Sequence, residues 1–152
     1  MNVFSIELQI RESHTLQPDG YSYIIYKLGK TSTIAYYKPF ANKLLLKSEN
    51  NIIYYIAKCR PTYVGYLKNQ QIKMSVLKPH DFLTDLSSAE FKSIRPTILD
   101  NILIHLFSKS EYMSLTQIQK HYQCTPNNID RLFKTTLGMS FNQYQNILLN
   151  TT

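Results

Sequence analysis

A run of helix start and stop signals near the C-terminus constrains this chain more than any other feature. Ser114 is followed three residues later by Gln117, and such a pair satisfies the unpaired N–H groups at the start of a helix. Thr125 and Pro126 form a second start, because a threonine oxygen accepts from the first turn and proline costs no hydrogen bond at the first helical position. Gly138 supplies a left-handed stop. The sequence therefore predicts two short helices joined by a tight turn.

The second predicted helix, residues 126–137, has one apolar side and one polar side. Its apolar residues recur at helical spacing: Ile129, Leu132, Phe133 and Leu137. The other side carries polar and charged residues: Asn127, Asp130, Arg131 and Lys134. Asparagine can pair with adenine, arginine with guanine, and aspartate can accept from cytosine. Two helices with such an exposed face are the layout of a DNA-reading helix-turn-helix.

The same segment carries a family resemblance. Residues 125–141 read Thr-Pro-Asn-Asn-Ile-Asp-Arg-Leu-Phe-Lys-Thr-Thr-Leu-Gly-Met-Ser-Phe. This run resembles the first helix-turn-helix of the AraC-type transcription regulators, whose pattern there is Ser-Pro, an aliphatic residue three positions on, Arg-Leu-Phe-Lys and then Gly-Met-Ser/Thr-Phe. The resemblance implies that outward residues of this helix read DNA, which carries over to Asn127, Asp130 and Arg131.

One departure from the family pattern concerns the residues beyond this unit. The DNA-binding region of AraC-type regulators resembles a pair of helix-turn-helix units joined by a long linker helix. Here the residues after Gly138 suffice for the opening of that linker, with Ser140 as its N-cap and Gln143 completing another capping pair. We therefore expect the second unit to be missing.

Each residue of the predicted DNA-binding set also has a purely structural explanation. The set is Thr125, Asn127, Asn128, Asp130, Arg131 and Lys134. Thr125 and Lys134 are candidates for phosphate contacts, through the helix N-terminus and through charge respectively. Asn128 could instead serve the N-terminal turn of the helix, and Asp130 could pair with Lys134 one turn away. Polar residues on an exposed helix face need no DNA partner.

The charge of the chain is distributed unevenly. Of the formal net charge of +7, residues 96–152 hold +1 and residues 1–95 hold +6. Neutralisation of phosphates supplies essentially all nonspecific affinity for DNA and much of the specific affinity. We therefore expect the helical unit alone to bind DNA weakly, unless dimerisation or a basic surface on the first half contributes.

The first 91 residues predict a small antiparallel β barrel or sandwich. Apolar and polar residues alternate over residues 4–10, the pattern of a strand with one buried face. Further runs rich in β-branched and aromatic residues predict strands separated by turn signals: residues 21–28, 33–37, 43–47, 52–58, 62–67 and 72–77. Nine of the twelve tyrosines lie in this half. They could line a pocket for a small-molecule effector, or they could be ordinary core and cross-strand packing.

Two short motifs in this half carry a second resemblance. Residues 16–29 read Leu-Gln-Pro-Asp-Gly-Tyr-Ser-Tyr-Ile-Ile-Tyr-Lys-Leu-Gly, and residues 63–66 read Tyr-Val-Gly-Tyr. The first resembles the Leu-Pro-Asp-Gly entry and first long strand of the sensory domain in a group of short AraC-type regulators, apart from the inserted Gln17. The second resembles the glycine turn of that group. The resemblance implies a domain over residues 1–91 that senses a ligand or forms a homodimer.

The remaining segments are predicted to be helical. Residues 79–91 favour a short helix and residues 92–95 a linker. After Pro96, apolar residues recur at three- and four-residue spacing: Ile98, Leu99, Ile102, Leu103 and Leu106. We therefore expect an α+β fold, in which the β domain of residues 1–91 packs against a helix-turn-helix domain of three to four helices over residues 96–152.

Enzyme and metal chemistry find little support in the sequence. The chain lacks the HExxH and GxSxG motifs and a phosphate-binding glycine loop, and its four histidines are scattered: His14, His80, His105 and His121. We expect no enzyme, no catalytic or metal site and no cofactor. Two cysteines, Cys59 and Cys124, are too few for a disulfide framework, so we expect both to be reduced and buried.

Localisation is predicted from what the sequence lacks. No apolar run approaches the ~20 residues that span a bilayer, and the N-terminus does not show the basic-then-apolar pattern of a secretion signal. We therefore expect a cytoplasmic protein with no membrane partner.

Two functions remain as hypotheses. The first is a DNA-binding transcription regulator, a homodimer whose helix of residues 126–137 enters the major groove of double-stranded DNA. The second is a regulatory interaction protein, a truncated family member whose helical unit binds a partner regulator or closes a dimer without reading DNA. The near-neutral helical unit and the missing second unit favour the second hypothesis, whereas the motif favours the first, which we prefer.

Overall fold

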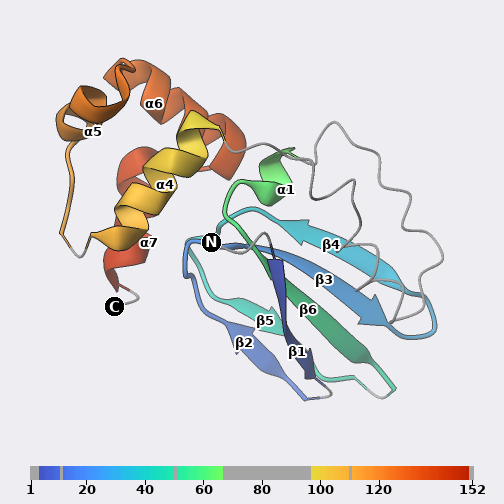
Figure 1. Ribbon diagram of the computed structural model, residues 1–152. Helices are drawn as coiled ribbons and strands as arrows, with labels where there is room; N and C mark the ends of the chain where they lie inside the picture. The colour runs from blue at the N-terminus through green and yellow to red at the C-terminus, as the bar shows by residue number, and fades with distance from the viewer. Residues whose placement is uncertain (1–3, 11, 50, 67–96, 110, 151–152) are drawn as a thin grey trace.

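The computed structural model describes residues 4–10, 12–49, 51–66, 97–109 and 111–150 of the chain (Figure 1). The fold is mixed α+β, with the strands first and most of the helical residues after them. The strands are β1 Phe4–Ile10, β2 His14–Leu16, β3 Ser22–Leu28, β4 Thr33–Tyr37, β5 Leu44–Leu46 and β6 Ile53–Cys59. The helices are α1 Tyr63–Tyr66, α4 Ile98–Ser108, α5 Leu115–Tyr122, α6 Pro126–Leu132, the π-helical turn η2 Phe133–Leu137, and α7 Phe141–Asn150.

The strands form two antiparallel sheets. The larger sheet has the order β1-β6-β3-β4, and β2 pairs with β5 in a separate two-stranded sheet. Leu16 of β2 and Leu46 of β5 share a buried cluster with Ile25 of β3 and Ile56 of β6, so the small sheet packs on one face of the large one. Within the described strands, β1 and β4 remain sheet edges, and the barrel considered from the sequence is not closed. The prediction of small antiparallel sheets is confirmed.

One predicted strand is wrong and one strand was not predicted. The strand expected over residues 62–67 is instead a single helical turn, α1, in which the Tyr63 side chain is completely buried. The three-residue strand β2 escaped prediction because it is too short to show an alternating pattern. The strand expected at 72–77, the helix at 79–91 and the linker at 92–95 lie outside the described residues.

The helices of the second half start at the N-cap residues that the sequence predicted. Ser114 accepts a hydrogen bond from the Gln117 N–H at 3.2 Å and its own N–H donates to the Gln117 amide oxygen at 2.8 Å. Ser140 and Gln143 repeat this exchange at the start of α7. Gly138 adopts the left-handed conformation with φ 76° and ends the π-helical turn. The helix expected from Pro96 begins at Ile98 among the described residues.

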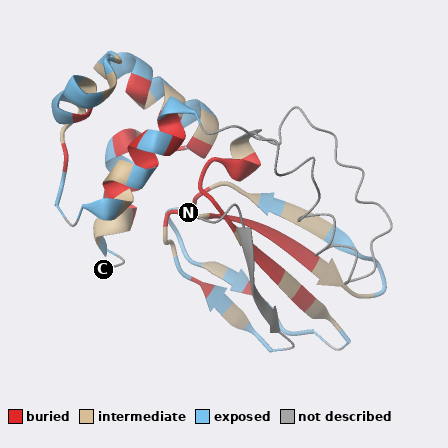
Figure 2. Ribbon diagram, viewed as in Figure 1, coloured by how far each residue is buried: buried red, intermediate tan, exposed pale blue. Residues whose placement is uncertain are grey.

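The helical half has a hydrophobic core of its own (Figure 2). Phe133 meets Phe141 and Tyr144 edge to face, with ring centroids 5.2 and 5.6 Å apart, and all three side chains are fully buried. Leu99, Ile102 and related residues of α4 pack into the same cluster. This core holds α4, α6 and α7 together. None of the described helices is long and apolar enough to cross a membrane.

The two halves pack against each other, as the sequence led us to expect. The Tyr144 hydroxyl of α7 donates to the carbonyl of Gly20 at 2.7 Å, in a buried hydrogen bond. The Thr62 hydroxyl donates to the carboxylate of Asp100 on α4 at 2.5 Å. The backbone of Gly65 lies so close to η2 that an added Cβ would overlap the carbonyl oxygen of Thr136. These contacts attach the helical half to the β half at several points.

Candidate nucleic-acid interface

Local capping sets the position and start of α6. The Thr125 hydroxyl accepts a hydrogen bond from the Asn128 N–H at 3.3 Å, and Pro126 occupies the first helical turn. Shortly before it, Gln123 ends α5 in the left-handed conformation with φ 52°. This conformation reverses the chain within a few residues. The expected role of Asn128 at the N-terminal turn is therefore present through its backbone N–H, while its side chain remains exposed.

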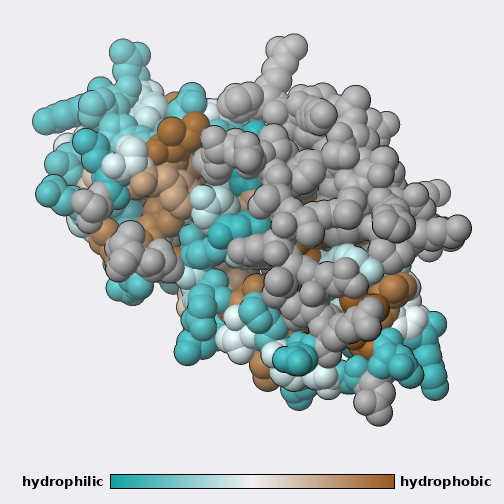
Figure 3. Space-filling view, turned by 60° about the horizontal axis from the view of Figure 1, so that its bottom comes forward, coloured by the Kyte–Doolittle hydropathy of each residue, from teal (hydrophilic) through white to brown (hydrophobic). Residues whose placement is uncertain are grey.

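The two sides of α6 and η2 differ in burial, as predicted from their spacing. Ile129, Phe133 and Leu137 are completely buried. Leu132, which was expected on the same side, is only partly buried. The opposite side is exposed along its length: Thr125, Asn127, Asn128, Arg131 and Lys134. The surface of the helical half is correspondingly hydrophilic at its outer end and carries a hydrophobic band towards the β half (Figure 3).

Asp130 is the one predicted DNA-binding residue whose polar atoms are engaged on both sides. One carboxylate oxygen accepts from the Lys134 ammonium at 2.8 Å, and the other accepts from the Phe141 N–H at 3.0 Å. The hydrogen bond from Lys134, followed by that from Phe141, lowers the pKa of Asp130 below its ordinary value. The structure thus contains the pair with Lys134 that the spacing allowed. It also links the middle of α6 to the first turn of α7.

The end of the helix is widened and contacted by the β half. Over residues 133–137 the backbone forms a π-helical turn, a feature often found at functional sites. The Thr135 hydroxyl donates to the Arg131 carbonyl at 2.9 Å, and the Lys38 ammonium donates to the Thr135 carbonyl at 3.3 Å. Lys38 therefore places a positive charge at the negative end of the helix dipole. No signal in the sequence pointed to Lys38, because it is 97 residues away and no local pattern marks the contact.

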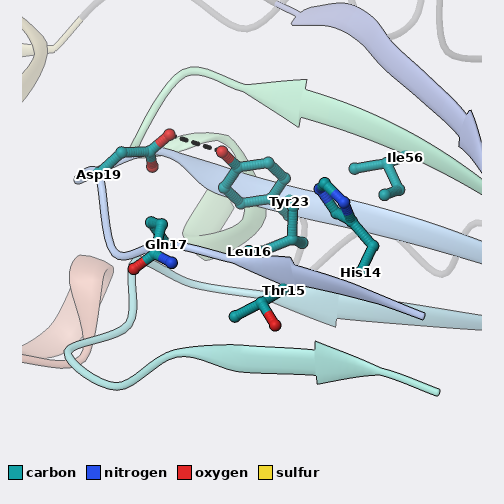
Figure 4. Close-up of a pocket in the computed structure, with 7 residues that line it drawn as sticks. All are labelled: His14, Thr15, Leu16, Gln17, Asp19, Tyr23 and Ile56. Carbon is teal, nitrogen blue, oxygen red and sulfur yellow. Dashed lines mark hydrogen bonds between the residues drawn. The ribbon is translucent and has the colours of Figure 1, made fainter.

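A hollow in the β half lies where a small-molecule effector was considered (Figure 4). Its volume is about 350 Å³, and it is lined by His14, Thr15, Leu16, Gln17, Asp19, Tyr23 and Ile56. The Tyr23 hydroxyl donates to the Asp19 carboxylate at 2.6 Å. Tyr23 is the sole tyrosine among these seven lining residues, whereas Tyr26, Tyr54 and Tyr63 are buried in the packing. Most tyrosines of known burial in this half therefore serve the core or its margin.

The histidines and cysteines of the described segments do not gather into a reactive site. His105 and His121 lie with ring centroids 5.1 Å apart, and burial followed by the charge of His121 lowers the pKa of His105. Among the described residues, no group of three or more His, Cys, Asp or Glu side chains could hold a metal ion. Burial raises the pKa of the Cys59 thiol to about 12. Cys124 is also free but only half-buried, which corrects the expectation that both cysteines are buried.

No protein-family model, no curated protein and no solved structure matches this chain.

Proposed function

We propose that this chain is a DNA-binding transcription regulator of the AraC type, with residues 126–137 as the recognition helix in the major groove. The observation that carries the proposal is the exposed polar face of α6, on which Asn127 and Arg131 lie one turn apart above a buried apolar side. At 1.5 Å per residue, α6 and η2 together are about 18 Å long, which suits contact with a few base pairs. The AraC-like motif of residues 125–141 supports the same assignment.

The six residues of the predicted DNA-binding set are proposed to have three different roles. Asn127 and Arg131 are proposed to contact base edges, since both side chains are exposed and both residue types make bidentate contacts with bases. Thr125, Asn128 and Lys134 are proposed to contact the DNA backbone, which orients the helix in the groove. Asp130 is proposed to act as a positioning residue, because its two oxygens already hold Lys134 and the N–H of Phe141.

The proposed regulator needs more positive charge than the helical half contains. Lys134 shares its charge with Asp130, and residues 96–152 have a net charge of only +1. Association of two copies would double the number of DNA contacts, and the sensory domain of residues 1–91 is the proposed site of dimerisation. We therefore expect DNA binding by the dimer to depend steeply on salt, with a slope of about −0.9 for each phosphate neutralised.

The test begins by selecting bound sequences from a library of random DNA duplexes with the full chain. Fluorescence anisotropy then measures the affinity for the selected duplex across salt concentrations. Arg131→Ala is expected to weaken binding by about 5- to 150-fold, the loss of one good bidentate base contact, and to relax the base preference at one position. Lys43→Ala is the matched control, because Lys43 is an exposed cation on the β half far along the chain from the motif. Equal losses for the two variants would reject base reading by α6.

The interaction-protein alternative is supported by the internal Asp130–Lys134 pair, which reduces the charge offered to DNA. It predicts no selected DNA sequence and no binding at low salt. It also predicts a dimer or hetero-complex, seen by analytical ultracentrifugation, that Arg131→Ala leaves unchanged. That combination of results would replace the DNA-binding proposal.

A further inference from the structure

A second hollow lies at the junction between the β half and α7. Its volume is about 530 Å³, and its lining comes from three segments: Gln17, Pro18, Asp19, Ala41, Ile147 and Asn150. Ligand sites commonly have volumes of roughly 300–1,000 Å³ and occur preferentially where two structural units meet. This junction cavity is separate from the hollow of Figure 4, although Gln17 and Asp19 contribute to both.

The lining indicates the chemistry of a ligand. Gln17 and Asn150 have primary amides that both donate and accept hydrogen bonds, and both residues are exposed. Pro18, Ala41 and Ile147 add apolar surface. Such a surface suits a small molecule with amide groups and one aliphatic side chain.

The charge of the lining argues for a neutral ligand. Among the described residues of the lining, Asp19 alone is ionisable. Its carboxylate accepts from the Tyr23 hydroxyl at 2.6 Å, from the Tyr21 N–H at 3.0 Å and from the Lys58 ammonium at 2.9 Å. The ion pair with Lys58 compensates the charge of Asp19 locally. None of the lining residues that the structure describes is cationic, so an anionic ligand would find no partner among them.

The cavity adjoins the contact that ties α7 to the β half. Gly20 follows directly on the lining loop, adopts φ +83°, and an added Cβ there would be 2.7 Å from the Leu148 side chain. Its carbonyl accepts the buried hydrogen bond from Tyr144, one turn before Ile147 on the same helix. Tyr144 in turn packs edge to face on Phe133. Phe133 lies on the buried side of its helix, and Arg131 and Lys134 on the other side are exposed.

We propose that the junction cavity binds a small neutral amide with an aliphatic side chain, and that this ligand strengthens the contact between the loop of residues 17–20 and α7. The expected consequence is tighter DNA binding, because the loop contacts α7 and α7 packs against the buried side of the recognition helix. That consequence rests on the proposed function, whereas the binding itself does not. Coupling between two sites is reciprocal, so DNA raises the affinity for the ligand by the same factor.

Binding is tested first without DNA, by NMR on the full chain with N-acetyl-leucinamide as the probe at millimolar concentration. Backbone and side-chain amide signals of residues 17–20, 41 and 147–150 are expected to shift. Ala41→Trp fills the cavity and is expected to abolish these shifts. Asn42→Trp is the matched control, since Asn42 is the exposed neighbour and does not line the cavity. Absent shifts, shifts elsewhere, or unchanged shifts in Ala41→Trp would overturn the site.

The preference for a neutral ligand and the effect of the ligand on DNA affinity are each measured separately. N-acetyl-leucine, which carries a carboxylate, is expected to bind more weakly than the amide, and equal binding would overturn the assigned ligand class. Anisotropy with the selected DNA is expected to show higher affinity when the amide is saturating, and less gain in Tyr144→Phe. Unchanged DNA affinity at saturation would overturn the coupling. Amide binding by a chain that binds no DNA would reject the proposed function and leave the site standing.

Discussion

The two halves of this molecule are stabilised over different distances along the chain. In the helical half, each of α5, α6 and α7 starts at a side chain that bonds three residues ahead, and the buried residues come from neighbouring helices. In the β half, β3 pairs with β6, about thirty residues later, and β1 pairs with β6 at the far edge. The helical half is therefore specified by local signals, whereas the β half depends on pairing between distant residues. Their junction includes a close approach of other atoms to the backbone at two glycines, Gly20 and Gly65.

The largest expected effect tests whether the helical core also supports the β half. Phe133→Ala removes a fully buried ring from the centre of this core and should lower the free energy of unfolding by about 3–5 kcal/mol. Urea denaturation followed by circular dichroism and by tyrosine fluorescence measures the loss. Tyr36→Ala, at a site 41% exposed, should cost much less. Coincident transitions with both probes would show one cooperative unit, and separate transitions would mean that the halves unfold independently.

A change at the junction should have the next largest effect. Gly65→Ala places a Cβ against the backbone oxygen of Thr136, so either α1 or η2 must move, at a cost of about 1–3 kcal/mol. Gly29→Ala is the control, because its nearest neighbour, at 3.2 Å, is the side chain of Ile52. Calorimetry of both variants measures the melting temperatures. A Gly65→Ala protein as stable as Gly29→Ala would show that the junction is looser than the contact implies.

Loss of one hydroxyl at the junction should cost less. Tyr144→Phe keeps the ring packed on Phe133 but leaves the buried carbonyl of Gly20 without its donor, which should cost about 1 kcal/mol. For a chain of this size that corresponds to roughly 2–4 °C in melting temperature. Tyr112→Phe is the matched control, since the Tyr112 hydroxyl bonds to Asn142 on the surface. Similar losses in the two variants would contradict a special role for the buried hydrogen bond.

The smallest expected effect is a dependence on pH that belongs to the helical half. Burial, His121 and Lys109 lower the pKa of His105 in the folded state below its ordinary value of about 6.5. Neutral His105 therefore contributes stability above about pH 6.5, and this contribution is lost as the pH falls through the folded value. Melting temperatures measured from neutral to mildly acidic pH should fall less in His105→Gln than in the original chain. Parallel curves would exclude His105 as the cause.

Much of the architecture could be predicted because its signals lie within a few residues of one another. The strand over Thr33–Tyr37 and the start of α6 at Pro126 have the expected bounds, since alternation and capping act over two to four residues. The strand predicted around Tyr63 is wrong because aromatic and β-branched residues also suit a buried helical turn. The contact that accompanies the helical turn is between Gly65 and the distant Thr136, which no local pattern indicates. The candidate site likewise has features that local spacing predicts and others that it does not. Exposure of Asn127 and Arg131 followed from helical spacing, but the Phe141 N–H that engages Asp130 could not be foreseen.

By itself, the sequence determined where the C-terminal helices start and stop, which side of α6 is apolar, and that the first half pairs as antiparallel strands. Tertiary structure alone decided that the sheet formed by the described strands is open, that Asp130 is held by α7, and that the loop of residues 17–20 contacts Tyr144. The physical reason is the distance over which each interaction acts. Caps and periodicity depend on neighbours in the chain, whereas Gly20 and Tyr144 are 124 residues apart and are brought together by the packing of the two halves.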